Sequence, residues 1–299
     1  MNKVNLYLKE DFLDCCELFL CSYLENKGFE YRYLFFRNWC LQDGDLFDDN
    51  IKLSNDYVYI ERANFWQELY DVFEVNTIWH HNIISSNFKN DKNLTLHLVD
   101  AKYLPWMKVY YKKTSAEHYI YIDDFNTLNN QFYVIDLKLN FRGWINSNII
   151  YNAYESMGKM TFEYTSPKYQ LNLDIKKSFK KTKAEAQKSI VKIEEFLNKI
   201  KRSEENTLLK KHTTLSFRLK QVIEVKLSFV ELLKQISNYE NDYLLLQTQC
   251  LYSIESWKVL RTYLMKGKIK SQYDLEKLKT ILSNIWENEI NTLKLLQNI

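Results

Sequence analysis

The spacing of apolar residues divides the chain into two halves with different predicted secondary structure. In the first half, apolar and polar residues alternate in the runs LTLHLV (94–99), HYIYI (118–122) and QFYVIDL (131–137), which predicts β-strands. Residues 12–27 instead gather their apolar side chains on one helical face, and Gly28 follows as a stop signal. This half is therefore expected to combine a helix with an antiparallel sheet.

The second half has the periodicity of long amphipathic helices. Apolar residues recur there every three or four positions, which is the pattern of a helix that buries one face. Polar segments separate the helical stretches at 203–206, 237–242 and 265–272. The pattern changes at the sequence TSPKY, so we predict two domains, residues 1–166 and residues 167–299. The second domain is expected to be an α-helical bundle of three or four helices.

Composition narrows the class of protein. The chain has 299 residues, of which 46% are hydrophobic and 26% charged, as is usual for a globular protein. A net charge of only +3 argues against nucleic acid as a partner. No apolar run reaches the length of a membrane span, and the N-terminus lacks a signal-peptide pattern. We therefore expect a cytoplasmic protein without a membrane partner.

Several common functional motifs are absent from the sequence. It contains five glycines and neither GxGxxG nor a P-loop pattern, which excludes the usual nucleotide-binding loops. The five cysteines are irregularly spaced and include no CxxC, so neither a disulfide framework nor a structural zinc site is expected. The adjacent histidines of WHHN (79–82) point in different directions on a helix or a strand and suit chelation poorly. We predict no metal and no bound cofactor.

Three of the cysteines lie in the predicted N-terminal helix, and two of them are adjacent. Cys16 falls within the apolar face and is assigned to the core, whereas Cys15 lies about 100° away at its edge. Cys15 also lies in the first turn, where unpaired backbone N–H groups and the helix dipole stabilise a thiolate. Nearby acidic residues oppose this effect, so a positive partner is required. Two interpretations stay open: a nucleophile, or an inert, partly exposed thiol.

A predicted β-hairpin offers that partner. If the loop is centred on Thr127, His118 faces Asp136 across the strand pair, with about 4.5–5.5 Å between Cβ atoms. A carboxylate at this position orients an imidazole and favours its protonated form, although a one-residue slip in register would separate the two groups. Cys15, His118 and Asp136 then provide a thiol, a base and an orienting carboxylate. The alternative is that His118 and Asp136 form an unrelated polar pair.

The sequence DCCELFLCSYLENKG, quoted from residue 14 onward, resembles the catalytic-helix segment of papain-superfamily peptidases that trim double-glycine leaders. In that pattern a Leu follows the nucleophilic Cys after five and after nine residues, and a Gly after thirteen. Counting from Cys15 gives a match at all three positions, and counting from Cys16 gives none. The matching residues are Leu20, Leu24 and Gly28. The family also places its His and Asp about eighteen residues apart, as are His118 and Asp136.

A closer likeness is to the butirosin-biosynthesis protein H type of acyltransferase, in which VDxxYLP precedes the His. Here VDAKYLPW occupies residues 99–106. The cysteine transferase of closthioamide assembly, which joins a thioamide chain to a diamine, is similar in kind. The resemblance covers about residues 8–145 and implies an α+β, papain-like fold in which a catalytic helix packs on an antiparallel sheet. Lys9 stands where the leader peptidases carry Gln, so acyl transfer is favoured over proteolysis.

The resemblance implies a thiol-dependent acyltransferase of natural-product biosynthesis. Cys15 would take an acyl group from the phosphopantetheine thioester of an acyl or peptidyl carrier protein and pass it to a small amine, forming an amide. His118 would act as the base and Asp136 would orient it. Two alternatives stay open: a cysteine peptidase that cleaves a leader peptide, and a catalytically inactive papain-like scaffold that binds partners through its helices.

Three further features allow two interpretations each. Tyr103 and Trp106 either line a groove for the acyl chain or belong to the core. The lysine-rich run at 176–183 is either a solvated helix face or a docking site for an acidic carrier protein. The apolar-rich helical half is either a closed core or the basis of a homodimer.

Overall fold

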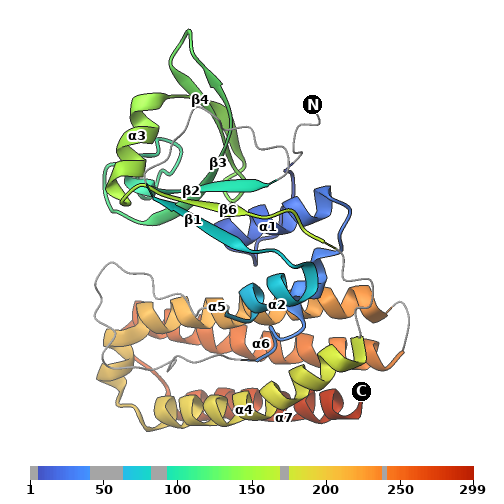
Figure 1. Cartoon of the computed structure of the whole chain (residues 1–299). Helices are drawn as coiled ribbons and strands as arrows, with labels where there is room; N and C mark the ends of the chain where they lie inside the picture. The colour runs from blue at the N-terminus through green and yellow to red at the C-terminus, as the bar shows by residue number, and fades with distance from the viewer. Residues whose placement is uncertain (1–5, 41–62, 82–92, 169–174, 238–240) are drawn as a thin grey trace. The chain divides into compact units, whose positions relative to one another are not determined.

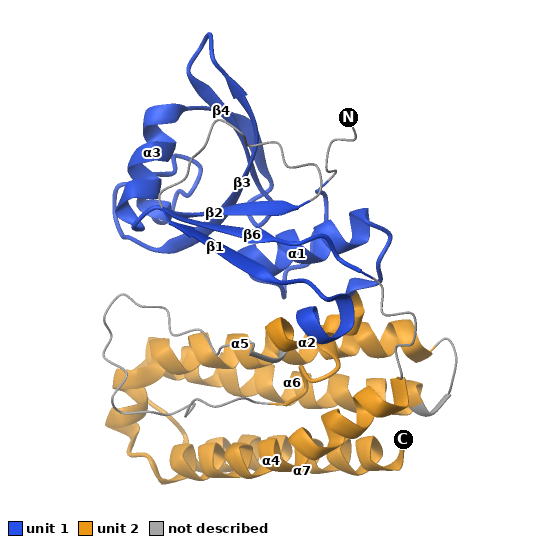
Figure 2. Ribbon diagram, viewed as in Figure 1, with its two compact units in different colours: residues 1–31, 53–57, 69–171 blue, residues 32–52, 58–68, 172–299 orange. Residues whose placement is uncertain are grey.

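A computed structural model gives the chain an α+β fold with one antiparallel sheet and several helices (Figure 1). Two compact units make up this fold (Figure 2). Unit 1 contains the sheet, and unit 2 contains the four long helices of the C-terminal half. The structure describes residues 6–40, 63–81, 93–168, 175–237 and 241–299.

The units are not contiguous in sequence. Unit 1 comprises residues 1–31, 53–57 and 69–171, and unit 2 comprises residues 32–52, 58–68 and 172–299. The change from sheet to long helices thus falls close to the point where the apolar periodicity changes. The segments 32–40 and 63–68 group with the long helices, which the pattern of apolar residues did not indicate.

The helix predicted within residues 12–27 is α1 (Cys15–Asn26), and it begins directly after Asp14, which caps its N-terminus. The Asp14 carboxylate accepts the Glu17 N–H over 2.8 Å, and Glu17 Oε2 accepts the Asp14 N–H over 3.0 Å. This reciprocal capping box fixes the first turn. Gly28, at φ +84°, ends the helix as predicted. Cys15 is consequently the first residue of the helix.

Six strands form the sheet of unit 1, in the spatial order β1-β6-β2-β3-β4-β5, and each neighbouring pair is antiparallel. The three predicted strands are confirmed as β2, β3 and β4. The other three had no alternating run long enough to predict them. The strands are β1 (Thr77–His81), β2 (Leu94–Asp100), β3 (Glu117–Asn126), β4 (Gln131–Asp136), β5 (Phe141–Asn146) and β6 (Met160–Tyr164).

Helix α3 packs against one part of this sheet and closes a core. Its residues contact β2, β4 and β5, and the apolar side chains between them are almost fully buried. The members of this core include Val99, Ile120, Phe132, Val134 and Ile150. The shorter elements of the chain are η1 (Tyr31–Phe35), α2 (Ala63–Phe73), η2 (Ala101–Tyr103) and α3 (Ser147–Ser156).

The predicted register of the hairpin β3–β4 was wrong. Ile122 lies opposite Val134, whereas a loop centred on Thr127 would place Ile122 opposite Phe132. The loop is shorter and later than predicted, because residues 123–126 extend strand β3, and a bulge follows Ile122. A shift of two residues leaves every side chain on its original face. His118 and Asp136 are therefore diagonal neighbours on one face and not a directly opposed pair.

Unit 2 is built on four long helices: α4 (Ile175–Arg202), α5 (Glu205–Ser237), α6 (Asn241–Lys270) and α7 (Leu275–Asn298). Helix α6 packs against α5 and α7, and α4 packs against α7. The predicted apolar stripes are buried along these helices. The third predicted break comes later than expected, because α6 continues to Lys270. No helix within the described ranges is both long and apolar enough to cross a bilayer.

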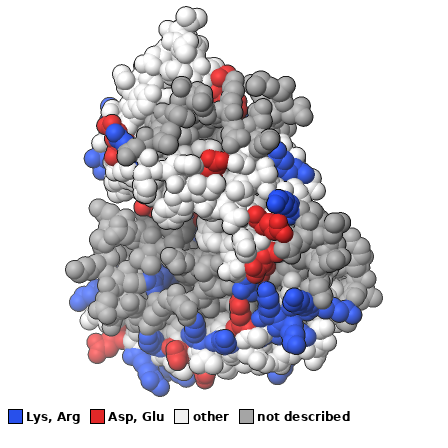
Figure 3. All heavy atoms as spheres, viewed as in Figure 1, with Lys and Arg blue, Asp and Glu red and all other residues white. Residues whose placement is uncertain are grey.

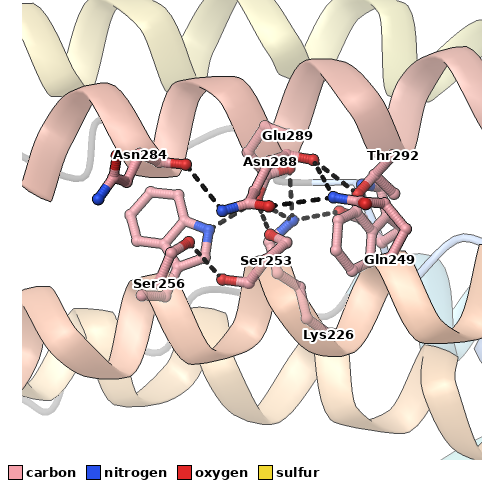
Figure 4. Close-up of polar contacts among 10 residues, drawn as sticks. Lys226, Gln249, Ser253, Ser256, Asn284, Asn288, Glu289 and Thr292 are labelled. Carbon is pink, nitrogen blue, oxygen red and sulfur yellow. Dashed lines mark hydrogen bonds and ion pairs between the residues drawn. The ribbon is translucent and has the colours of Figure 1, made fainter.

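A polar cluster lies in the interior of unit 2 and joins three of its helices (Figure 4). Lys226 on α5 is fully buried, and its Nζ lies 3.0 Å from the Glu289 carboxylate on α7. Glu289 Oε1 also accepts hydrogen bonds from Ser253 Oγ and Trp257 Nε1 on α6, each over 2.6 Å. The buried charges are thus paired and hydrogen-bonded, as low-dielectric surroundings require.

Candidate active site

Cys15 lies at the start of α1, in the position that the sequence predicted for an activated thiol. Its side chain is buried, with 8% of the residue exposed. The capping box uses the N–H groups of Asp14 and Glu17 and leaves those of Cys15 and Cys16 outside it. Backbone N–H groups of a first turn favour negative charge nearby. The thiol of Cys15 therefore lies at the positive end of the helix dipole.

Three of the other cysteines, Cys16, Cys40 and Cys250, have surroundings that oppose a thiolate. Cys16 Sγ lies 3.4 Å from Tyr164 Oη, and burial, reinforced by the charge of Asp14, raises the pKa of Cys16 well above its usual value. Burial also raises the pKa of Cys40 to about 12 and that of Cys250 strongly. None of the five cysteines, all of which lie in described segments, forms a disulfide. Cys16 thus belongs to the core, as its place on the apolar face predicted.

His118 and Asp136 form a buried hydrogen-bonded pair. The distance between His118 Nε2 and Asp136 Oδ2 is 2.8 Å, and the two residues are 5% and 0% exposed. The predicted hydrogen bond between them is therefore present, although the predicted register is not. A diagonal pair of side chains on one face of a sheet is within reach of a long side chain such as histidine.

The second nitrogen of the His118 ring is the one that is available to Cys15. Since Asp136 holds Nε2, Nδ1 is the nitrogen that remains for the hydrogen bond between His118 and Cys15. Burial alone would lower the pKa of His118, but the charge and hydrogen bond of Cys15, together with Asp136, raise it to about 10. The contacts with Cys15 and Asp136 thus favour the protonated form of the ring.

Asp136 accepts three hydrogen bonds, two of which the sequence did not suggest. Trp106 Nε1 donates to Oδ2 over 2.8 Å, and the backbone N–H of Leu139 donates to Oδ1 over 3.1 Å. Burial raises the pKa of Asp136, but His118, Trp106 and Leu139 outweigh this effect and lower it below the usual value. Asp136 is consequently held as a carboxylate. The Trp106 ring stacks on Phe141, with centroids 4.1 Å apart.

A lysine connects the turn after Asp136 to the segment before Cys15. Lys138 Nζ donates to the carbonyl oxygens of Asp11 and Leu13, over 2.8 and 2.6 Å. Residues 137–140 form the turn between β4 and β5, so this side chain joins the end of strand β4 to the entry of helix α1. These two hydrogen bonds therefore link strand β4, which carries Asp136, to the segment that leads into helix α1, which carries Cys15.

The structure thus brings together Cys15, His118 and Asp136, which lie far apart in the sequence. Trp106 packs against the core of unit 1, as one of its two interpretations had it, and it also donates to Asp136, which neither interpretation included. No periodic pattern in YLPW distinguishes a tryptophan that donates to a buried carboxylate from one that lines a core. Tyr103 lies in η2 and is 37% exposed, so it is not a core residue.

Other candidate ligands do not assemble into a metal site. The histidines of WHHN lie on β1, where His80 Nε2 is 3.0 Å from Glu163 Oε2 and His81 is exposed, while residue 82 lies outside the described residues. Among the parts of the chain that the structure describes, no three His, Cys, Asp or Glu side chains are arranged to hold a metal ion.

Comparison with known proteins adds no assignment. No family model matches the sequence, and no curated protein is similar enough to match it.

Proposed function

We propose that this protein is a papain-like, cysteine-dependent acyltransferase that forms an amide in natural-product biosynthesis. The observation that carries the proposal is the contact of Cys15 with His118, whose other ring nitrogen is bound to Asp136. The α+β unit with its N-terminal helix, and the long helices that would form a bundle domain after it, agree with the motif resemblance. A reducing compartment such as the cytoplasm suits the free thiols.

The resting state of this site is a thiolate–imidazolium pair. The raised pKa of His118 keeps its proton on the ring, and the first turn of α1 stabilises the negative sulfur. The Asp136 carboxylate holds the ring through Nε2 and stabilises its positive charge. The positive partner that the acidic residues around Cys15 require is therefore His118.

In the first step, Cys15 Sγ attacks the carbonyl carbon of an acyl thioester. A C–S bond forms, and the carbonyl oxygen becomes an oxyanion that the backbone N–H groups of the first turn of α1 can receive. When the intermediate collapses, the original C–S bond breaks. The departing thiolate takes the proton from His118 Nδ1, which leaves a neutral imidazole and an acyl-Cys15 thioester.

In the second step, an amine attacks acyl-Cys15. The thiolate charge that raised the pKa of His118 is now gone, so this pKa is lower and the ring is neutral and free to accept a proton. His118 accepts the proton of the attacking amine, the amide forms, and Cys15 leaves as the thiolate. Burial of Cys15 and His118 limits the access of water, which favours transfer to an amine over hydrolysis.

The proposed donor is a thioester on the phosphopantetheine arm of an acyl or peptidyl carrier protein. Its support is the motif resemblance together with the lysine-rich start of α4, where Lys176, Lys177, Lys180 and Lys181 are exposed. Figure 3 shows Lys and Arg side chains gathered on the drawn face of unit 2. Complementary charge would speed the encounter with an acidic carrier protein. Tyr103 stays a candidate for contact with the acyl chain, since its ring is partly exposed.

The test is an acyl-transfer assay with acyl-pantetheine thioesters of different chain length and a panel of primary amines. We expect amide formation with ping-pong kinetics, a transient mass increase on Cys15 equal to the acyl group, and no activity in Cys15→Ala. Cys16→Ala is the matched control, because it removes the neighbouring thiol, and it should keep the adduct on Cys15.

Two other results would identify the alternatives. Release of free acid at the same rate with and without amines would indicate a hydrolase, and cleavage of peptides would point to the peptidase. Absence of any adduct on Cys15 with all thioesters, in protein shown to be folded, would favour the inactive scaffold and contradict the proposal.

A further inference from the structure

Lys138 connects the two parts of the candidate active site although it belongs to neither. It lies in the turn between β4 and β5, two residues after Asp136. Its ammonium group donates to the carbonyl oxygens of Asp11 and Leu13, over 2.8 and 2.6 Å, and Leu13 lies two residues before Cys15. Since consecutive Cα atoms are about 3.8 Å apart, each end of this connection lies within about 8 Å of a residue of the site.

The turn that carries Lys138 is firmly attached to Asp136. The backbone N–H of Leu139 donates to Asp136 Oδ1 over 3.1 Å, and the N–H of Asn140 donates to the Leu137 carbonyl oxygen over 3.2 Å. Asn140 has φ +52°, a left-handed conformation that asparagine tolerates better than most residues. The side chain of Leu137 is buried. The backbone of Lys138 therefore has a fixed position relative to the carboxylate.

Other contacts hold helix α1 to different strands. The helix packs on β2 and β3, where the ring of Phe19 lies 6.5 Å from that of Tyr121. Cys16 Sγ lies 3.4 Å from Tyr164 Oη on β6. The capping box at its N-terminus is internal to the helix and its cap, so it does not attach the helix to the sheet. These contacts fix the body of α1, whereas Lys138 attaches the entry of the helix to the end of β4.

We propose that Lys138 is a positioning residue that holds Cys15 against the His118 ring and thereby sets the fraction of Cys15 present as thiolate. The inference rests on the proposed function, since it takes Cys15 as the nucleophile and His118 as its partner. A hydrogen bond weakens steeply once its atoms move apart or out of line. Without the bond from Lys138 to Leu13, the first turn of α1 can move away from the ring, and the thiol loses the partner that favours its charged form.

The groups around Cys15 make its ionisation depend on His118. Asp14 and Glu17 beside it in the sequence are acidic and disfavour a negative sulfur. Burial raises the pKa of three further groups in this region, which stay uncharged: Cys16, Tyr119 and Tyr164. Besides the helix dipole, the group that interacts with Cys15 and favours its charge is His118 on β3. A small displacement of the first turn therefore changes the thiolate fraction.

The test is the rate of Cys15 alkylation by iodoacetamide in the full chain between pH 6 and 9, followed by peptide mass spectrometry. We expect Lys138→Met to react about threefold to tenfold more slowly than the wild type at pH 6 and to approach the wild-type rate at pH 9, where an ordinary thiol also ionises. Lys138→Arg keeps a charged group with several N–H donors, so it should recover at least about half of the lost rate. Equal rates in Lys138→Arg and Lys138→Met would overturn the assignment to these hydrogen bonds.

Arg142→Met is the matched control. Arg142 Nη2 donates to the carbonyl oxygen of Leu6, so this variant also removes a cation and a hydrogen bond to the backbone of the N-terminal segment, but far before Cys15 in the sequence. It should keep the wild-type profile. A loss of stability alone does not change the pH profile of the folded protein, so this readout separates positioning from a general structural role.

Salt distinguishes a positioning contact from a charge that acts at a distance. The difference between the wild type and Lys138→Met should persist in about 1 M salt, because screening weakens long-range attraction and leaves positions unchanged. A difference that disappears at high salt would overturn the positioning role. A Lys138→Met profile that coincides with that of Arg142→Met, while His118→Ala still loses the fast reaction, would overturn this inference alone. If the wild type and His118→Ala also coincide, His118 does not activate Cys15, and the proposed function fails together with the inference.

Discussion

Trp106 donates its indole N–H to Asp136 Oδ2 over 2.8 Å, and the same oxygen holds His118 Nε2. Replacing Trp106 by Phe keeps a ring to stack on Phe141 but removes this donor. The pKa of Asp136 should then rise, since Trp106 is one of the groups that lower it. We expect the acid limb of the pH profile of Cys15 alkylation to move to higher pH, and the rate to fall roughly threefold to tenfold at pH 6.

The matched control for this experiment is Trp144→Phe. Trp144 lies on β5, is 44% exposed and packs edge-on against Tyr133. A general effect of losing an indole ring would appear in both variants. If the pH profile of Trp106→Phe coincides with that of Trp144→Phe, Trp106 does not position the Asp136–His118 pair.

His97 should make the stability of the protein depend on pH in the acid range. It lies on β2, is 3% exposed, and burial lowers its pKa to about 4 from the ordinary value of 6.5. Between these two values the unfolded chain binds a proton that the folded chain does not. The free energy of unfolding should therefore fall as the pH drops from 6.5 to 4, by about 3 kcal/mol for this group.

The measurement is urea unfolding at several pH values for the wild type and His97→Gln. The glutamine variant should show a flatter dependence on pH in this range, whatever its absolute stability. His81→Gln serves as the control, because His81 is exposed on β1, and it should follow the wild type. Equal slopes for the wild type and His97→Gln would contradict the prediction.

The buried pair of Lys226 and Glu289 should behave unlike the exposed pairs of the same helices (Figure 4). Removing one partner leaves an uncompensated charge in the interior. Lys226→Met or Glu289→Gln alone is therefore expected to lower the free energy of unfolding by about 3 to 5 kcal/mol, and the double variant by less than the sum. Urea unfolding followed by the helical circular dichroism signal measures this.

The control is Glu276→Gln on α7. Lys279 Nζ lies only 2.6 Å from Glu276 Oε1, but the two side chains are 47% and 83% exposed. Exposed pairs contribute little, so this variant should change stability by less than about 1 kcal/mol. A loss of the same size in both sets would show that burial of the Lys226–Glu289 pair has no special effect.

The helices and strands that could be predicted from the sequence are those marked by patterns among residues close together in the chain. The alternation in LTLHLV and QFYVIDL, the helical face that Cys16 shares, and the stop at Gly28 each depend on residues close in sequence. The helix starts after Asp14, whose capping box with Glu17 is also a local signal, although the apolar face extends back to residue 12.

The contacts that the sequence could not predict depend on register and on long-range packing. A bulge after Ile122 and a late turn moved the pairing of β3 and β4 by two residues. His118 and Asp136 stayed together only because an even shift preserves the face of each side chain. Trp106 donates a hydrogen bond to Asp136, and Lys138 donates one to the segment before Cys15. Both contacts join a turn to a distant element, and no spacing of residues in the sequence predicts them.

The most direct test of the central claim is the rate of alkylation of each cysteine by iodoacetamide, followed by peptide mass spectrometry between pH 6 and 9, for the wild type and His118→Ala. Because the His118 imidazolium persists until the pH approaches 10, the Cys15 rate in the wild type should stay nearly flat over this range. The other four cysteines should label slowly in the folded protein. In His118→Ala, the Cys15 rate at pH 6 should fall by at least about tenfold and then rise with pH like that of an ordinary thiol. A Cys15 rate that rises with pH equally in both proteins would contradict a histidine-activated nucleophile.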